Sequence, residues 1–167
     1  DWSSDVCSSD LKTGQPLHAF DEIKASSQSI KIRRARNAEK LKLLNEQNIV
    51  LDDDCLVIAN DKEAIALAGI MGGLSSGVSS DTNAVILESA FFNPISIAKT
   101  ARKFNIQTDA STRFERGVDP SLCPYALEEA IALITKCCGG RLIFRKVVSS
   151  DVHIPPKHMI SFRPIKV

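Results

Sequence analysis

The feature that most constrains the fold is an apolar run at residues 85–92, VILESAFF, which is followed at once by Asn93 and Pro94. Short continuous apolar runs are typical of strands that are covered on both faces. Asparagine as N-cap and proline at the first helical position form a strong helix start. The pattern therefore predicts a buried strand that leads directly into a helix ending near Asn105.

Glu88 interrupts this apolar run with a carboxylate. A carboxylate in apolar surroundings is costly unless a partner or a cavity takes its charge. Glu88 therefore either faces solvent or an ion-pair partner, or it lines a pocket. The residue alone favours the first interpretation, because charged side chains are rarely buried.

The segments before this centre predict strands. Alternating apolar and basic residues predict half-buried strands at residues 29–34 and 40–44, with their lysines and arginines facing outward. The three aspartates at residues 52–54 lack the glycine and distal glutamate of a calcium loop and predict a turn. Two apolar runs at residues 55–60 and 63–70 then predict a hairpin.

The segments after the centre predict a second helix and a further strand. Asp119 and Pro120 repeat the helix start signal, apolar residues recur at helical spacing, and Gly139 ends the pattern near residue 138. Residues 141–149 resemble a strand. The charges of residues 113–120, RFERGVDP, predict a salt-bridged scaffold that closes a loop. We therefore predict an α+β fold with mixed or antiparallel sheets packed against two main helices.

Composition limits the classes of function. A net charge of +1 is not typical of a protein that binds nucleic acid unaided, because binding phosphates requires a basic field. The five cysteines form no CxxC pair, which argues against a zinc site and a disulfide framework and favours a reducing compartment. The sequence contains no secretory apolar segment and no run of the roughly 20 apolar residues that span a membrane. A cytoplasmic protein without a membrane partner is expected.

The two ends of the chain differ from its middle. Residues 1–11, DWSSDVCSSDL, have no regular periodicity and predict a disordered or non-native tail. Residues 12–152 are expected to form one module. Residues 153–167 are expected to be a linker, containing Pro155 and Pro156, and the first strand of a following, truncated module.

Five motifs occur together and in one order. They are GQPLHAFD (14–21), ALAGIMGG (66–73), LESAFF (87–92), TDAS (108–111) and RFERGVDP (113–120). Together they resemble the bacterial phenylalanine–tRNA ligase beta subunit, in the module that edits mischarged tRNA. The resemblance runs from about residue 12 to the end of the chain.

The resemblance implies a function and a set of site residues. It implies that the whole enzyme attaches phenylalanine to its tRNA with ATP and Mg²⁺, as a heterotetramer with an alpha subunit. This module is implied to bind the 3′ end of tRNA(Phe) and to hydrolyse mischarged tyrosyl-tRNA(Phe), with no metal or cofactor of its own. The implied catalytic residues are His18 and Thr108, and the implied substrate-binding residues are Glu88, Ala110, Gly72 and Gly73.

The chemistry of these residue types is consistent with editing. A hydrophobic pocket discriminates against one extra hydroxyl by only about a hundredfold, so a second site is needed to remove tyrosine. Glu88 is suited to accept the tyrosine hydroxyl, and backbone amides near Gly72 and Gly73 are suited to stabilise an oxyanion. Alone, His18 is more typical of a structural histidine, and the glycine pair of a turn.

The sequence is also consistent with two other interpretations. In the first, the module is noncatalytic and serves packing or RNA docking, with Glu88 paired to Arg113 or Arg116. In the second, it is a free-standing hydrolase of another aminoacyl ester. The first is distinguished from editing by whether Glu88 faces an arginine, or a cavity with His18 and Thr108.

Overall fold

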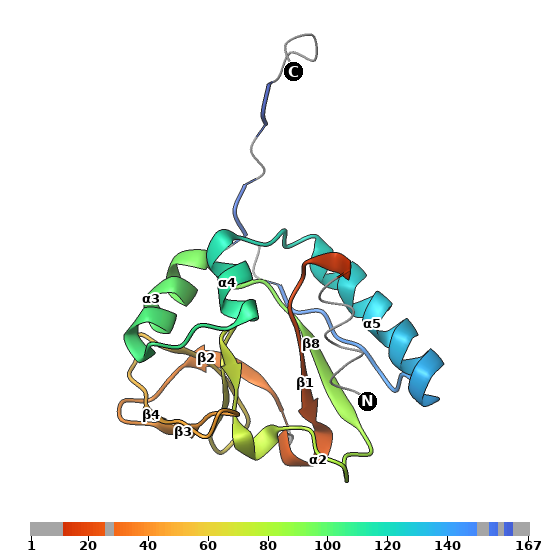
Figure 1. The fold of residues 1–167 in the computed structure, drawn as a ribbon, viewed down its shortest axis with the longest axis horizontal. Helices are drawn as coiled ribbons and strands as arrows, with labels where there is room; N and C mark the ends of the chain where they lie inside the picture. Colours follow the sequence, from red (N-terminus) through yellow and green to blue (C-terminus); the bar gives the residue numbers. More distant parts are fainter. Residues whose placement is uncertain (1–11, 26–28, 150–153, 157–158, 162–167) are drawn as a thin grey trace.

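The computed structural model describes residues 12–25, 29–149, 154–156 and 159–161 (Figure 1). Its strands are β1 (Leu17–Asp21), β2 (Lys31–Arg34), β3 (Lys40–Lys42), β4 (Asn48–Val50), β5 (Leu56–Ala59), β6 (Ala64–Leu67), β7 (Met71–Gly72) and β8 (Val85–Ser89). Its helices are α2 (Glu22–Ala25), the short 3-10 helix η1 (Leu74–Ser76), α3 (Pro94–Phe104), α4 (Asp109–Arg116) and α5 (Leu122–Cys138). The described strands pair antiparallel. The predicted α+β class is confirmed.

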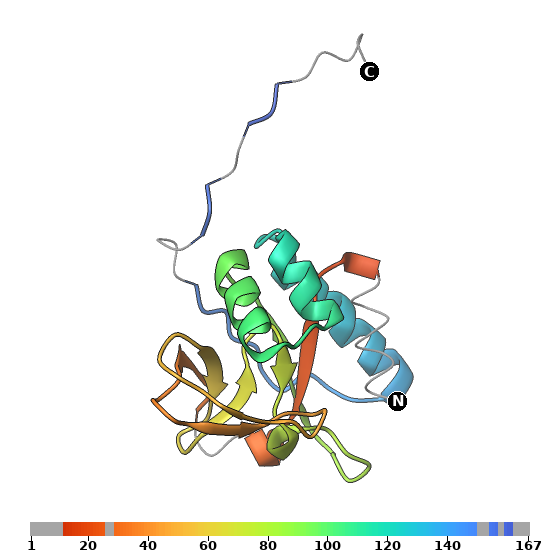
Figure 2. The same ribbon diagram turned by 60° about the vertical axis from the view of Figure 1, so that its left-hand side comes forward.

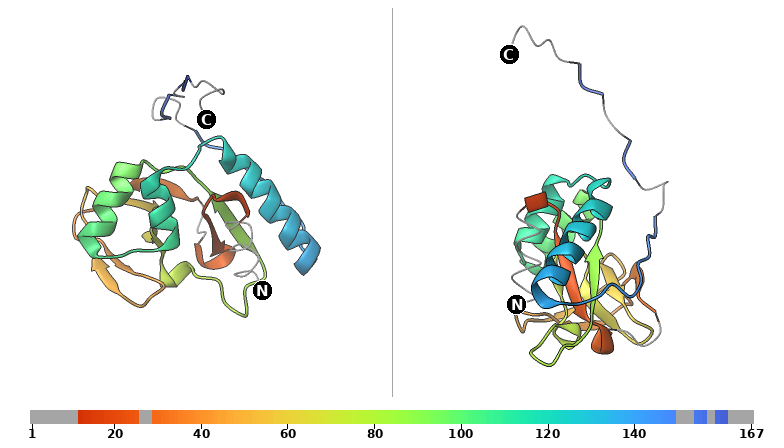
Figure 3. Two further views of the ribbon diagram at one scale, coloured as in Figure 1. Left: turned by 45° about the horizontal axis from the view of Figure 1, so that its top comes forward. Right: turned by 90° about the vertical axis from the view of Figure 1, so that its right-hand side faces the viewer.

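A two-stranded ribbon made of β1 and β8 divides the molecule. Its register places His18 directly opposite Glu88. Successive side chains of a strand point to opposite faces, so each face of the ribbon takes alternate residues. One face packs on α5, and the other faces the small β-strands together with α3 and α4 (Figure 3). The predicted strand is thus confirmed over Val85–Ser89 and is covered on both faces, although each of its residues remains half-buried.

The main core lies among the shorter strands. A four-stranded sheet has the order β2-β5-β6-β7, and β3 and β4 form a separate hairpin. Strand β6 is buried along its whole length. The hairpin predicted from residues 55–70 is confirmed as β5 and β6, and the side chain of Asn60 closes its turn by accepting hydrogen bonds from the amides of Lys62 and Glu63.

Strand β2 is present as predicted, but its buried and exposed faces are the reverse of those predicted. Ile32 is 61% exposed, whereas Arg33 is partly covered. The guanidinium of Arg33 donates two hydrogen bonds to the Glu39 carboxylate, at 2.7 and 2.8 Å. Glu39 also accepts from the amides of Arg36 and Ala64. The Arg33 hydrogen bonds above all, and then these two amides, lower the pKa of the Glu39 carboxyl to about 2. A bidentate ion pair therefore holds Arg33 on the side where an isoleucine was expected.

Helix α3 follows its sequence signals closely. The Asn93 side chain accepts hydrogen bonds from the amides of Ile95 and Ser96, Pro94 is the first residue, and Asn105 ends the helix with a φ of 52°. Helix α5 begins later than predicted, because the Asp119 carboxylate accepts from the amide and hydroxyl of Ser121 before the first turn. Its end at Gly139, with a φ of 72°, is as predicted. Figure 2 shows α3 and α4 side by side above the strands.

Two expectations for the loops and the C-terminal part are corrected. Residues 109–116 form helix α4, which takes up the first part of the loop expected at residues 113–120, because Thr108 and Ser111 build a capping box at its start. Residues 141–149 form no strand, and they are exposed because no described strand lies along them. The predicted tail at residues 1–11 and most of the predicted strand at residues 158–167 lie outside the described residues. In the part that is described, no helix has the length and apolarity to cross a membrane.

Candidate functional site

A small cavity lies between the ribbon, the strands β6 and β7, and helix α4. It encloses about 60 Å³. His18 and Glu88 form its polar side. Its other walls are mainly apolar and include Ile70, Gly72, Phe92, Ala110 and Phe114. We call this space the ribbon cavity. Four of the six residues implied by the motifs therefore meet here, from β1, β7, β8 and α4.

Glu88 has no ion-pair or hydrogen-bond partner among the described residues. Its side chain lies on the same face of β8 as Ile86, which belongs to the main core. Removal from water raises the pKa of the Glu88 carboxyl to about 7. The predicted alternative, pairing with Arg113 or Arg116, is therefore wrong for the described part of the molecule.

His18 is held as a neutral imidazole beside Glu88. Its ring meets Phe20 edge to face, with the ring centroids 4.5 Å apart. Burial lowers the pKa of His18 to about 4. Gly72 makes room for the ring, because a Cβ atom there would lie 2.6 Å from both Cε1 and Nε2 of His18. The glycine is therefore required by close approach to the imidazole.

The apolar wall depends on residues that the sequence reasoning did not assign to the site. Phe92 and Phe114 meet edge to face with their centroids 5.1 Å apart. Phe114 lies one helical turn after Ala110, so both point to the same side of α4. This i, i+4 spacing was the available signal. Gly69 also lines the cavity, with a φ of 68°, and a Cβ there would be 2.8 Å from the Phe92 ring.

Thr108 does not line the cavity. Its hydroxyl donates a hydrogen bond to the Ile70 carbonyl at 2.8 Å and accepts one from the Ser111 amide at 3.0 Å. As the N-cap of α4, the side chain is already used by the helix end. These contacts fasten α4 to the cavity wall at Ile70, and the catalytic role implied for Thr108 stays a prediction.

Gly73 is also outside the lining. Its amide donates to the Ile65 carbonyl at 2.8 Å. A Cβ at Gly73 would lie 2.5 Å from that carbonyl oxygen, so the residue serves close packing against β6. The amide of Gly73 thus donates within the fold, and the substrate-binding role implied for this residue stays a prediction. Gly72 remains in the cavity wall.

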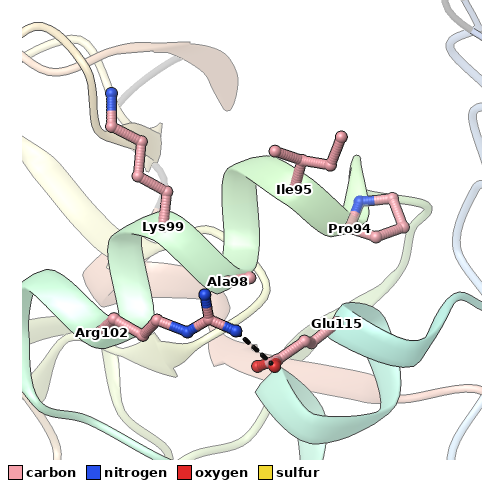
Figure 4. A pocket seen from close by; sticks show the side chains of 6 residues that line it. All are labelled: Pro94, Ile95, Ala98, Lys99, Arg102 and Glu115. Carbon is pink, nitrogen blue, oxygen red and sulfur yellow. Dashed lines mark hydrogen bonds and ion pairs between the residues drawn. The ribbon is translucent and has the colours of Figure 1, made fainter.

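A second hollow lies on the outer side of α3 and α4 (Figure 4). It is larger, about 650 Å³, and open to solvent. Arg102 pairs with Glu115 across it at 3.3 Å, and Lys99 pairs with Asp54 at 2.7 Å. The ion pair through Glu115 agrees with the structural role predicted for the charged segment. Exposed ion pairs of this kind contribute little to the free energy of folding. Their charged groups are solvated and paired, so this hollow offers no desolvated side chain as a catalytic group. Across the described residues, no three metal-binding side chains converge.

Comparison with known proteins identifies relatives of the chain. The family described as "B3/4 domain" matches residues 9–139. The phenylalanine–tRNA ligase beta subunit of Francisella tularensis is 52% identical over 132 residues, which is 79% of this chain and 17% of the relative. The corresponding subunit of Acinetobacter baylyi is 45% identical over 157 residues, 94% of this chain and 20% of the relative. The beta subunit of Methylococcus capsulatus is 52% identical over 130 residues, which is 78% of this chain and 16% of the relative. The chain thus spans at most about a fifth of these relatives.

Proposed function

Because this chain belongs to the B3/4 domain family, and because its curated relatives are beta subunits of phenylalanine–tRNA ligase, we propose that it is a segment of such a subunit and hydrolyses mischarged tyrosyl-tRNA(Phe). The whole enzyme attaches phenylalanine to its tRNA with ATP and Mg²⁺ in the cytoplasm, together with an alpha subunit. None of that synthetic chemistry is assigned to this chain.

The observation that carries the proposal is the unpartnered Glu88 carboxyl in an apolar cavity. When ionised, it accepts a hydrogen bond from the hydroxyl of a tyrosyl ring. A phenylalanyl ring leaves the same carboxylate desolvated and without a partner, which disfavours its binding. The selectivity of the site is therefore opposite to that of a purely apolar pocket.

The apolar wall contacts the ring of the substrate. Phe92 and Phe114 offer aromatic edges, and the methyl group of Ala110 limits the width of the space. The 60 Å³ of the cavity is smaller than the roughly 150 Å³ that accommodates a benzene molecule. The ring is therefore only partly enclosed, and binding requires the walls to move apart.

The hydrolytic step uses water rather than a side-chain nucleophile. Water adds to the ester carbonyl, and the tetrahedral intermediate expels the ribose hydroxyl of the tRNA end. His18 is neutral near pH 7, so its imidazole is able to orient the water or accept a proton from it. Thr108 acts indirectly by holding α4, and with it Ala110, against Ile70. The His18 ring packs directly on Gly72, so the imidazole lies beside that stretch of backbone.

The discriminating observation is the neighbour of Glu88. The cross-strand neighbour is His18, on the cavity side, and none of the described arginines pairs with the carboxylate. This supports hydrolysis over a noncatalytic packing or RNA-docking module, for which a structural ion pair was expected.

The proposal is tested by narrowing the cavity. In the full-length subunit assembled with its alpha subunit, Ala110→Trp fills the cavity, and we expect loss of tyrosyl-tRNA(Phe) deacylation with phenylalanine charging preserved. Ala132→Trp is the matched control, because Ala132 is exposed on α5. Full-rate deacylation by Ala110→Trp, or an equal loss in both variants, would reject the assignment of the reaction to this cavity.

A further inference from the structure

A side chain takes the place of a backbone amide at one end of the β1–β8 ribbon. The last paired residues at this end are Leu17 and Ser89. Extending the register by one residue places Pro16 opposite Ala90. Proline has no N–H, so it donates no hydrogen bond to the facing strand. The side-chain amide of Gln15 donates instead, from Nε2 to the Ala90 carbonyl at 2.8 Å.

The alternation of hydrogen bonds along the ribbon shows that a donor is needed at this position. At the other end of the ribbon, the Glu22 amide donates to the Ala84 carbonyl at 3.0 Å. Facing residues in an antiparallel pair of strands exchange hydrogen bonds at every second position. Pro16 and Ala90 lie an even number of residues from Glu22 and Ala84, so the residue at position 16 is one that would donate. Gln15 therefore supplies the donor that the proline lacks.

The Gln15 side chain is only partly satisfied where it lies. It is fully buried, and its Nε2 also donates to the Pro16 carbonyl at 3.2 Å. Its Oε1 has no hydrogen-bond partner among the described residues. A buried oxygen without a partner lowers the stability of a fold, and an apolar side chain would avoid this loss. Stability alone therefore does not account for a glutamine at this position.

The segment that Gln15 holds lies between two parts of the ribbon cavity. Ala90 comes two residues after Glu88 and two residues before Phe92. Both of these residues line the cavity, and so does Pro16 on the facing strand. The hydrogen bond from Gln15 to Ala90 therefore fixes the polar side of the cavity, its aromatic wall and Pro16 relative to one another.

We propose that Gln15 is a positioning residue that sets the selectivity of the cavity, by holding Glu88 and Phe92 at a fixed spacing through Ala90. The inference rests on the proposed function, since that function requires the carboxyl to meet the hydroxyl of a ring that lies on the aromatic wall. Gln15 is not among the residues that line the cavity, so it acts through these neighbours and not by touching the substrate. A small displacement of either neighbour changes how well the hydroxyl is met.

The role is tested by removing the donor while keeping the length of the side chain. In the full-length subunit assembled with its alpha subunit, we expect Gln15→Met to lower the preference for tyrosyl- over phenylalanyl-tRNA(Phe) in deacylation by about tenfold or more, as misplaced contacts do. The readout is the ratio of the two kcat/KM values. A merely structural role changes only the fraction of folded enzyme, which lowers both values equally and leaves their ratio unchanged.

Ser89→Ala is the matched control for this variant. The Ser89 hydroxyl donates to the Cys123 carbonyl at 2.7 Å, on the α5 side of the ribbon and one residue before Ala90. The control therefore also removes one hydrogen bond from a side chain to a backbone carbonyl, and we expect it to leave the ratio of kcat/KM values unchanged. An equal fall in this ratio for Ser89→Ala and Gln15→Met, or no fall in either, would overturn the role of Gln15.

A double variant tests whether Gln15 replaces the amide that Pro16 lacks. Pro16→Ala restores a backbone N–H opposite Ala90, so in that background we expect Gln15→Met to lower the ratio by less than about threefold. The same loss in both backgrounds would overturn the replacement. Wild-type enzyme that hydrolyses neither ester would refute the proposed function and this role with it. Normal hydrolysis with an unchanged ratio in Gln15→Met would refute the role of Gln15 alone.

Discussion

The two faces of the β1–β8 ribbon perform opposite tasks with neighbouring residues. The face toward α5 carries Leu17, Ala19 and Leu87, which pack on Ala126, Ala130 and Ile134. The other face carries His18 and Glu88, which border the ribbon cavity. A single step along either strand changes an apolar packing contact into a desolvated titratable group, because the side-chain period of a strand is two.

The comparison shows that apolar packing and the buried titratable groups are separated by face rather than by segment. The α5 face contributes apolar burial that stabilises the fold. The cavity face reduces stability, since both of its titratable groups are shifted toward their neutral forms by burial. A substitution on one face should therefore change the free energy of unfolding, and a substitution on the other should change its pH dependence.

The largest expected effect on stability is on the α5 face. Ile134→Ala removes a buried side chain from the contact with the ribbon, so we expect the free energy of unfolding to fall by about 2 to 5 kcal/mol. Urea unfolding of the 167-residue chain measures this. Ile95→Ala, at a residue 78% exposed on α3, is the matched control with little change. Similar losses in the two variants would show that α5 is not a stabilising partner of the ribbon.

Glu88→Gln, on the cavity face, should raise the free energy of unfolding, whereas Ile134→Ala lowers it. In the folded protein the pKa of the Glu88 carboxyl is raised from the ordinary 4.5 to about 7. The free energy of unfolding of the wild type is therefore greatest below about pH 4.5 and falls as the pH rises from there to about 7. Glu88→Gln removes this loss. We expect the variant to be more stable than the wild type by about 1 to 3 kcal/mol near pH 8, allowing for the partial exposure of Glu88, with the difference vanishing near pH 4.5. A pH-independent difference would contradict the burial of the carboxyl.

His18→Gln should give a smaller effect in the opposite pH direction. The folded pKa of His18 is lowered from 6.5 to about 4, so wild-type stability is fully present above the ordinary value and is lost as the pH falls toward the folded one. Relative to a variant that does not titrate, the wild type should lose about 1 kcal/mol between pH 7.5 and 5.5. The measurement is the difference in urea midpoint at the two pH values; equal differences would contradict a buried neutral imidazole.

Local signals in the sequence predicted much of the fold. The Asn93–Pro94 start of α3 and the hairpin of β5 and β6 are determined by neighbours in the chain, and both are confirmed. Ile32 and Arg33 lie on the opposite faces to those expected, because Arg33 forms its ion pair with Glu39. Glu39 lies outside the strand, so the alternation within the strand does not reveal this pair. Residues 141–149 have the composition of a strand, but a strand also requires a pairing edge, which composition does not reveal.

The site was predictable only in part. His18 and Glu88 are 70 positions apart in the chain, and their proximity is set by the antiparallel register of β1 and β8. The shared motifs brought them together as an implication of family resemblance, whereas spacing gave no such signal. That Thr108 caps a helix was not predicted, although Ser111 three residues later is the local sign of that cap.

The central claim is that Glu88 recognises the tyrosine hydroxyl, and the most direct test compares tyrosyl- and phenylalanyl-tRNA(Phe) as substrates for deacylation. In the full-length enzyme, we expect the wild-type kcat/KM to favour the tyrosyl ester by about 10⁴, as sites built around a substrate hydroxyl do. Glu88→Ala is expected to abolish this preference while phenylalanine charging stays near normal. Unchanged hydrolysis of tyrosyl-tRNA(Phe) by Glu88→Ala would contradict the claim.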